Sequence, residues 1–134
     1  MSPAKAQAFD RYFEQVRPTA FLDDATTKNV LVYQRRFSGI VDVDEVCFGD
    51  SRLTLGLTQA SLLFAGFSTD YVDYWLELTG GGDEARAVVD FYSALFCVRF
   101  LSEQGQAFNK ERGETDPAKI ADLKTVLREL LTRI

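Results

Sequence analysis

Two carboxylates and an amide stand at a spacing that could hold a divalent cation. Asp24 is followed five positions later by Asn29, and Asp42 follows Asn29 by thirteen positions. The residues between them predict two short strands of a hairpin, at 30–33 and 37–41. Such a hairpin would bring Asp42 back to the loop that carries Asp24 and Asn29. Hard oxygen ligands of this kind suit Mg²⁺ that holds a polyphosphate.

The stretch from position 23 to position 50 is strongly acidic. Like charges at short range raise one another's energy, and a bound cation relieves that repulsion. On a strand, Asp42 and Asp44 would point to the same side, which makes both candidate Mg²⁺ ligands. The alternative is that both are turn residues at the strand end, and that Asp50 caps the following helix, which we favour for Asp50. The six carboxylates are Asp23, Asp24, Asp42, Asp44, Glu45 and Asp50.

Composition restricts the remaining chemistry. Histidine is absent, which excludes His-dependent nucleophilic catalysis and most zinc sites. A net charge of −5 argues against a nucleic-acid partner. The longest apolar-rich stretch, 85–101, contains three charged residues and predicts a buried helix instead of a membrane span. Cys47 and Cys97 form no metal or disulfide pattern, so we expect reduced core cysteines and a cytoplasmic protein.

The apolar periodicity predicts an α+β fold that is mainly helical, with one small β-hairpin and about five helices. A length of 134 residues favours a single domain. Asp116 and Pro117 give the last helix a cap and a first-turn proline. Segments 20–29 and 105–115 are expected to be loops. The expected helices are 3–16, 52–65, 70–78, 83–104 and 117–134.

Two segments, Phe21–Val32 and Gly39–Asp50, together resemble motifs of the aminoglycoside phosphotransferase and choline kinase family, which has a protein kinase-like fold. In that family, as in protein kinases, the catalytic Asp precedes an Asn by five positions, and a metal-binding strand follows. The resemblance implies that residues 1–134 form one domain like the C-terminal lobe of such an enzyme. It implies that Asp24 orients or deprotonates a substrate hydroxyl. Asn29 and Asp42 would bind Mg²⁺ on the phosphates of ATP or GTP.

The sequence departs from the family pattern at several points. Leu22 stands where the family usually has His, Ser51 where it often has Pro, and Thr54 near a position that is often Asp. Only 23 residues precede Asp24, and they predict helix. The phosphate-covering loop and strand lysine of an N-terminal lobe are therefore not expected, because the glycines at 80–82 lie between helices. We expect no appreciable phosphotransfer from this chain alone.

Three readings of function follow. The first is the C-terminal lobe of a small-molecule phosphotransferase, and the second is a non-catalytic binding or interaction module derived from such a lobe. The third is one domain of a longer gene product. The substrate would be a small hydroxylated molecule. A cationic one could use the aromatic and acidic residues at 70–77, although a core face is the favoured reading of those aromatics.

Uncovered apolar surface predicts self-association. We expect a homodimer that buries part of the N-terminal helix or the hairpin, with helix 116–134 as a second candidate surface. The alternative is a monomer in which the N-terminal helix folds over this uncovered apolar surface.

Overall fold

The computed structural model describes residues 3–44, 46–108, 111–112 and 115–134, and it confirms a mainly helical α+β fold. A short 3₁₀ helix, η1, spans Thr27–Asn29. The α-helices are α1 (Pro3–Gln15), α2 (Arg52–Phe64), α3 (Asp70–Leu78), α4 (Asp83–Glu103) and α5 (Pro117–Arg133). The strands are β1 (Thr19–Leu22), β2 (Val30–Tyr33), β3 (Arg36–Ile40), β4 (Val46–Gly49), β5 (Ala107–Phe108) and β6 (Glu111–Arg112).

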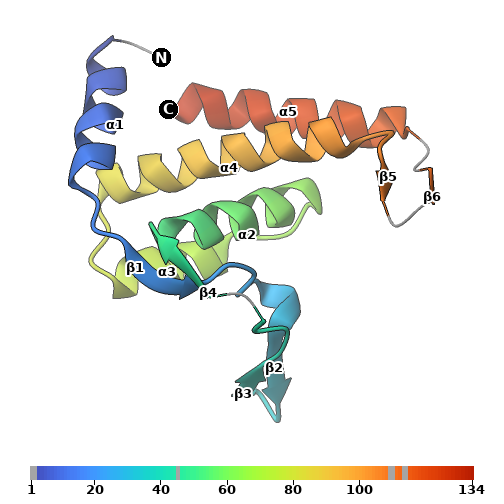
Figure 1. Ribbon diagram of the computed structural model, residues 1–134, viewed down its shortest axis with the longest axis horizontal. Coiled ribbons are helices and arrows are strands. Elements are labelled where there is room, and N and C mark those ends of the chain that lie inside the picture. The colour runs from blue at the N-terminus through green and yellow to red at the C-terminus, as the bar shows by residue number, and fades with distance from the viewer. Residues whose placement is uncertain (1–2, 45, 109–110, 113–114) are drawn as a thin grey trace.

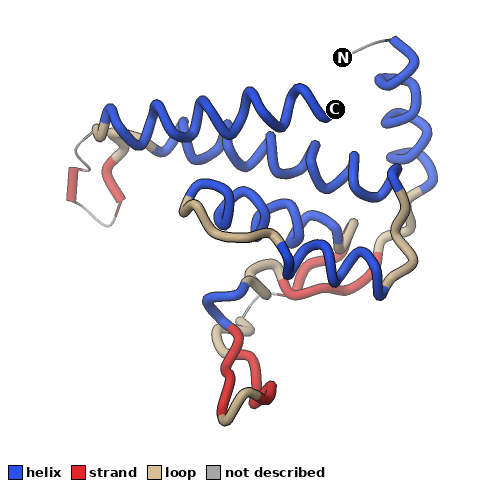
Figure 2. The backbone as a smooth tube through the Cα atoms, turned by 180° about the vertical axis from the view of Figure 1, so that it is seen from behind, coloured by secondary structure: helices blue, strands red, loops and turns tan. Residues whose placement is uncertain are grey.

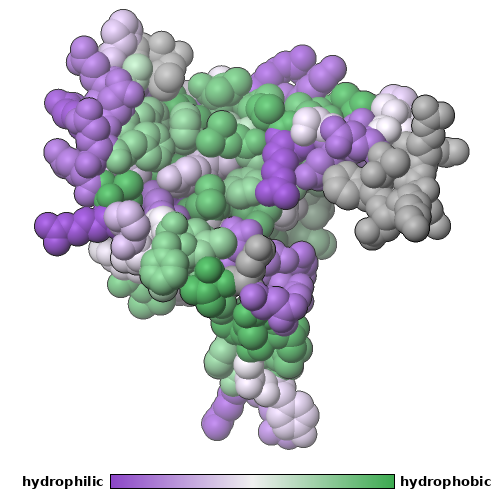
Figure 3. All heavy atoms as spheres, in the orientation of Figure 1, coloured by the Kyte–Doolittle hydropathy of each residue, from purple (hydrophilic) through white to green (hydrophobic). Residues whose placement is uncertain are grey.

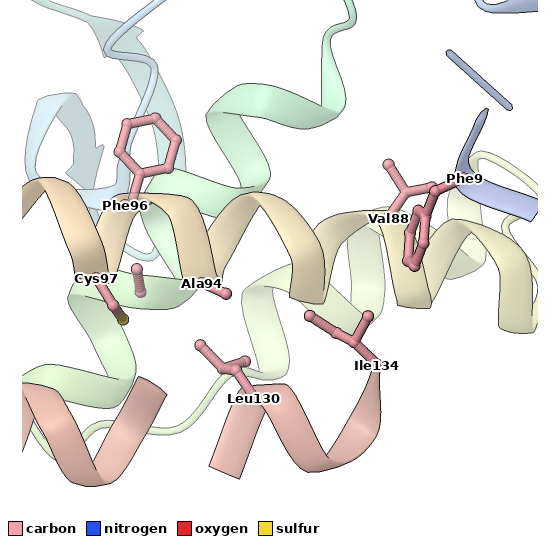
Figure 4. Close-up of a cluster of buried hydrophobic side chains, with 8 residues drawn as sticks. Phe9, Val88, Ala94, Phe96, Cys97, Leu130 and Ile134 are labelled. Atoms are coloured by element: carbon pink, nitrogen blue, oxygen red, sulfur yellow. The ribbon is translucent and has the colours of Figure 1, made fainter. Parts of the chain in front are cut away.

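The helices pack around α4, which lies between α2 and α5 (Figure 1). Leu130 of α5 and Ile134, which directly follows α5, face α4, and Phe9 of α1 lies at the end of the same cluster (Figure 4). Helices α2 and α4 approach closely at Gly56, where an added Cβ would lie 2.3 Å from the Cβ of Tyr92. As expected, the Asp116 side chain caps α5, accepting from the backbone N–H groups of Ala118 and Lys119.

Asp50 joins three helices through its carboxylate. Its Oδ1 accepts from the backbone N–H of Arg52, the first residue of α2, at 3.0 Å, although the N-cap residue of α2 is Ser51 and not the expected Asp50. Its Oδ2 accepts from the hydroxyls of Tyr12 at 2.5 Å and Tyr92 at 3.1 Å, on α1 and α4. Burial, and after it the hydrogen bond to Asp50, raises the pKa of Tyr12 to about 12. Asp50 is therefore a structural link.

A second buried polar cluster holds α2 to α4. The amide Nε2 of Gln59 donates to Asp90 Oδ1 at 2.5 Å and to Ser93 Oγ at 3.1 Å. All three side chains are buried. Burial is the main reason that the pKa of Asp90 is raised, and the Gln59 hydrogen bond partly offsets it.

The strands form two-stranded antiparallel sheets, and two of these frame the loops of interest. Strands β1 and β4 pair from Thr19↔Gly49 to Leu22↔Val46. Strands β2 and β3 form the predicted hairpin, which projects away from the helices (Figures 1 and 2). Its two-residue turn uses Gln34 and Arg35, with φ of 48° and 60°.

Three expectations were wrong, two about irregular segments and one about a cysteine. Segment 20–29 contains most of β1 and the helix η1, because β1 finds a partner in β4, far along the chain. Segment 105–115 contains β5 and β6. Cys97 is buried as expected, but Cys47 is only partly buried, on the short sheet. Ser2, a candidate cap of the first helix because serine is a favoured N-cap residue, lies outside the described residues.

No helix in the described part of the chain is both long enough and apolar enough to cross a membrane.

Candidate functional site

Asp24 and Asn29 are held on one tight turn, as the spacing predicted. The backbone carbonyl of Asp24 accepts from the N–H of Thr26 at 2.7 Å and from the side-chain amide of Asn29 at 2.8 Å. The N–H of Asn29 donates in turn to the carbonyl of Thr26 at 3.0 Å. These bonds fix the Asn29 side chain, which is 7% exposed. Because its Nδ2 is used internally, its Oδ1 remains as the oxygen that could bind a cation.

The loop is anchored to the helical body by Thr54. Its buried hydroxyl lies 3.0 Å from the carbonyl oxygen of Leu22 and 3.1 Å from that of Asp23, and donates to this pair. Thr54 stands near a position that is often Asp in the family that the two segments resemble. In this chain α2 supports the loop through a hydroxyl group. Sequence reasoning missed this contact because 31 or 32 positions separate its partners.

The backbone next to Asp42 returns to the loop that carries Asn29. The backbone N–H of Val41 donates to the carbonyl of Asn29 at 2.9 Å, so Asp42 directly follows a residue that is bonded to Asn29. The expected strand nevertheless ends at Ile40, one residue before Val41. Asp42 has a left-handed backbone with φ of 58°.

The expectation that strand alternation aims Asp42 and Asp44 to one side was therefore wrong. Both side chains lie exposed on a segment without regular structure, which agrees with the alternative reading of turn residues. Within the described residues, neither carboxylate is hydrogen-bonded to Asn29.

The donor set fits a weakly held hard cation. An amide oxygen of Asn29 and the carboxylates of Asp42 and Asp44 are ligands that Mg²⁺ accepts, and Mg²⁺ commonly completes its shell with water and phosphate oxygens. In the part of the chain that the structure describes, no three Asp, Glu, Cys or His side chains converge as a metal site. A cation here would therefore depend on ligands from outside these side chains.

A cavity of about 440 Å³ opens beside Asp24, between the loop and helices α2 and α4. Lys28 Nζ lies 2.6 Å from Asp24 Oδ2, and the Thr26 hydroxyl donates to Asp24 Oδ1 at 3.3 Å. Across the cavity, Arg99 pairs with Glu103 at 3.1 Å. Positively charged side chains, negatively charged side chains and several hydroxyl groups thus line one cavity.

No signal in the sequence indicates the far wall of this cavity. Ser61 and Arg99 come from two helices whose residues are distant in the chain, and their polar character is typical of any helix surface. Only the packing of α2 on α4 brings them opposite Asp24.

The aromatic residues of α3 lie partly in the core and partly on the surface. Trp75 packs against the buried cluster that includes Val72 and Leu76, which fits the favoured core reading for that residue. Tyr71 and Tyr74 are exposed, so the core interpretation is wrong for both. Asp73 is paired with Arg86 of α4.

Compared with known proteins, the chain matches no family model, no curated protein and no solved structure. The resemblance to kinase-like phosphotransferases therefore depends on the residues of the two segments themselves.

Proposed function

We propose that this chain is the C-terminal lobe of a Mg²⁺-dependent small-molecule phosphotransferase, which transfers a nucleotide γ-phosphoryl group to a hydroxyl. The observation that carries the proposal is the turn on which Asp24 and Asn29 are hydrogen-bonded, with Val41 bonded to the Asn29 carbonyl. A rigid turn with a carboxylate and an amide suits a reaction that depends on positioning and charge stabilisation.

Each residue has a separate role in this proposal. Asp24 accepts the proton of the acceptor hydroxyl or orients it, since its carboxylate borders the cavity. Asn29 Oδ1 and Asp42 hold Mg²⁺ on the phosphates of ATP or GTP, and Asp44 is an additional ligand. Thr54 acts through the loop backbone and is a positioning residue.

The cavity beside Asp24 is the proposed acceptor site. Its polar lining favours a small hydroxylated molecule, and Asp23 and Glu103 would favour an acceptor that also carries an amine. The proposed compartment is the cytoplasm, where nucleoside triphosphates are available.

Phosphotransfer also needs groups that cover the β- and γ-phosphates, and a second lobe would supply them. Without them, water reaches the phosphates and nothing fixes the in-line geometry. We therefore expect the 134-residue chain alone to bind metal without appreciable turnover.

Paramagnetic broadening by Mn²⁺ tests the site directly. In ¹⁵N spectra, Mn²⁺ at submillimolar concentration should broaden residues 24–29 and 41–44 first, more strongly when ADP is present. Asp42→Asn should weaken this broadening by about tenfold, since a charged ligand is lost. Asp70→Asn, which changes an exposed carboxylate on α3, is the matched control. Broadening centred on 70–77, or equal loss in both variants, would contradict the proposal.

A non-catalytic binding module is the second candidate, and the Lys28–Asp24 ion pair favours it. An ammonium group 2.6 Å from the carboxylate occupies the position that an acceptor hydroxyl would need. Lys28 is exposed and can move, so the two candidates differ in what Lys28→Ala does. In a complex with a catalytic partner lobe, the enzyme reading expects retained activity, which Asp24→Asn abolishes. The module reading expects no turnover from any variant.

A further inference from the structure

The β2–β3 hairpin leaves an unusual amount of apolar surface in solvent. Val32 is 66% exposed, and Tyr33 and Phe37 are each 69% exposed. Figure 3 shows apolar residues along the projecting hairpin down to its polar tip. Seven apolar residues of β2, β3 and the segment that follows are exposed, and apolar residues gathered in this way mark an interaction surface. They are Leu31, Val32, Tyr33, Phe37, Ile40, Val41 and Val43.

The two strands of the hairpin differ as edges. Strand β3 contains Arg36, Gly39 and a register irregularity at Ser38, and charges and bulges are features that discourage pairing at an edge. Strand β2 reads Val-Leu-Val-Tyr, with no charge, proline or glycine. Among the described residues β2 pairs only with β3, so its outer N–H and C=O groups are available to another strand.

The sequence of β2 suits pairing with itself. Tyr33 and Leu31 face β3, so the outward N–H and C=O groups of β2 belong to Val30 and Val32. In an antiparallel arrangement about a two-fold axis through Leu31, Val30 would lie opposite Val32 of the second copy, and Leu31 opposite Leu31 of the second copy. Apolar cross-strand pairs of this kind stabilise a sheet, and no like charges meet.

The charged residues at the two ends of the hairpin favour the same antiparallel arrangement. Arg35 and Arg36 lie at the tip of the hairpin, while Asp42 and Asp44 lie at its base, and all four are exposed. Within the described residues none of the four belongs to an ion pair. Antiparallel pairing of two β2 strands places the tip of each hairpin near the base of the other, so opposite charges meet. Parallel pairing would bring like charges together.

We propose that β2 pairs antiparallel with β2 of a second copy of this chain, which gives a four-stranded sheet in the order β3–β2–β2–β3 and a two-fold homodimer. The occupant of the surface is thus the chain itself. An edge contact covers only part of the exposed hairpin, so the interface falls in the small class, below about 1,200 Å² in total. We expect dissociation in the micromolar range.

Sedimentation velocity from 1 to 300 µM tests the proposal. The mass should rise from 15.1 kDa toward twice that value as the concentration increases. Val32→Lys should weaken association at least tenfold, because an edge lysine opposes strand pairing. Val98→Lys is the matched control, since Val98 is 52% exposed on α4. Both positions are exposed, so both variants should fold, which circular dichroism verifies.

The charge pattern needs its own variants. Replacing Arg35 and Arg36 by Glu should weaken the dimer, and adding Asp42→Lys and Asp44→Lys to the same chain should restore it. Amide hydrogen exchange at Val32 should slow with increasing concentration, while exchange at Val98 should not change. A monomer at every concentration overturns the proposal. So does a dimer that Val98→Lys disrupts and Val32→Lys leaves intact, which would place the contact on α4 and α5. Failure of the charge exchange to restore association would overturn the antiparallel arrangement.

Discussion

The helical body and the segment between Leu22 and Val46 differ in how their residues are held. In the body, Leu123 and Leu130 are fully buried, and Asp50 and Gln59 tie the helices together through polar clusters. In the segment, the hairpin side chains lie mostly in solvent, and the turn is fixed by backbone and amide hydrogen bonds. Burial thus stabilises the helical body. The other segment is held in place by local hydrogen bonds and by one threonine. Stability and the candidate chemistry are therefore separable in this protein.

Truncating one leucine in each region should give the largest contrast. Leu130→Ala removes a fully buried side chain between α5 and α4, and should lower the free energy of unfolding by about 2–5 kcal/mol. Leu31→Ala removes a side chain that is 47% exposed on β2, and should change it by less than about 0.5 kcal/mol. Urea unfolding followed by circular dichroism measures both. Similar losses would mean that the hairpin is part of the cooperative core.

The Thr54 anchor should show a medium effect with a local signature. Thr54→Val keeps the shape of the side chain but removes the hydroxyl that the carbonyls of Leu22 and Asp23 share, which costs about 1–2 kcal/mol. Amide exchange in residues 23–29 should accelerate more than exchange in α4. Thr58→Val is the control, because the Thr58 hydroxyl donates within α2 to the carbonyl of Thr54. Unchanged exchange in the loop would show that Thr54 does not position it.

The smallest expected effect concerns pH. The pKa of Asp90 is raised above its usual 3.8, mainly by burial, so the folded chain binds this proton more tightly than the unfolded chain. That contribution to stability is complete below the unfolded pKa and is lost as pH rises through the folded pKa. Asp90→Asn cannot titrate, so its stability relative to the parent chain should increase from pH 4 upward. Urea unfolding at several pH values measures the difference, with Asp122→Asn as a control for charge loss. Parallel curves for the parent and Asp90→Asn would contradict the assignment.

Local signals in the sequence were enough for the helices. Apolar periodicity, Asp116 with Pro117, and the glycines at 80–82 placed the helix boundaries within a residue or two of the observed ones. The turn from Asp24 to Asn29 was also predictable, since its bonds join residues at most five apart. Features that need distant partners were not predictable, and β1, the Thr54 anchor and the cavity wall at Arg99 belong to this group. The orientation predicted for Asp42 was wrong for another reason. Side chains alternate only within a strand, and β3 ends at Ile40, before Asp42 is reached.

The pairing of β1 with β4 has a consequence for how this protein could diversify. Leu22 and Val46 lie opposite each other, so the segment between them leaves the helical body and returns to it at one place. The β1–β4 pairing holds the two ends of this segment together. Lengthening a closed segment costs little, roughly 0.6 kcal/mol for each doubling. The turn and hairpin could therefore be exchanged, extended or grafted while the helices keep their packing. In evolutionary terms, the part of the chain proposed to carry chemistry is free to vary without a new core.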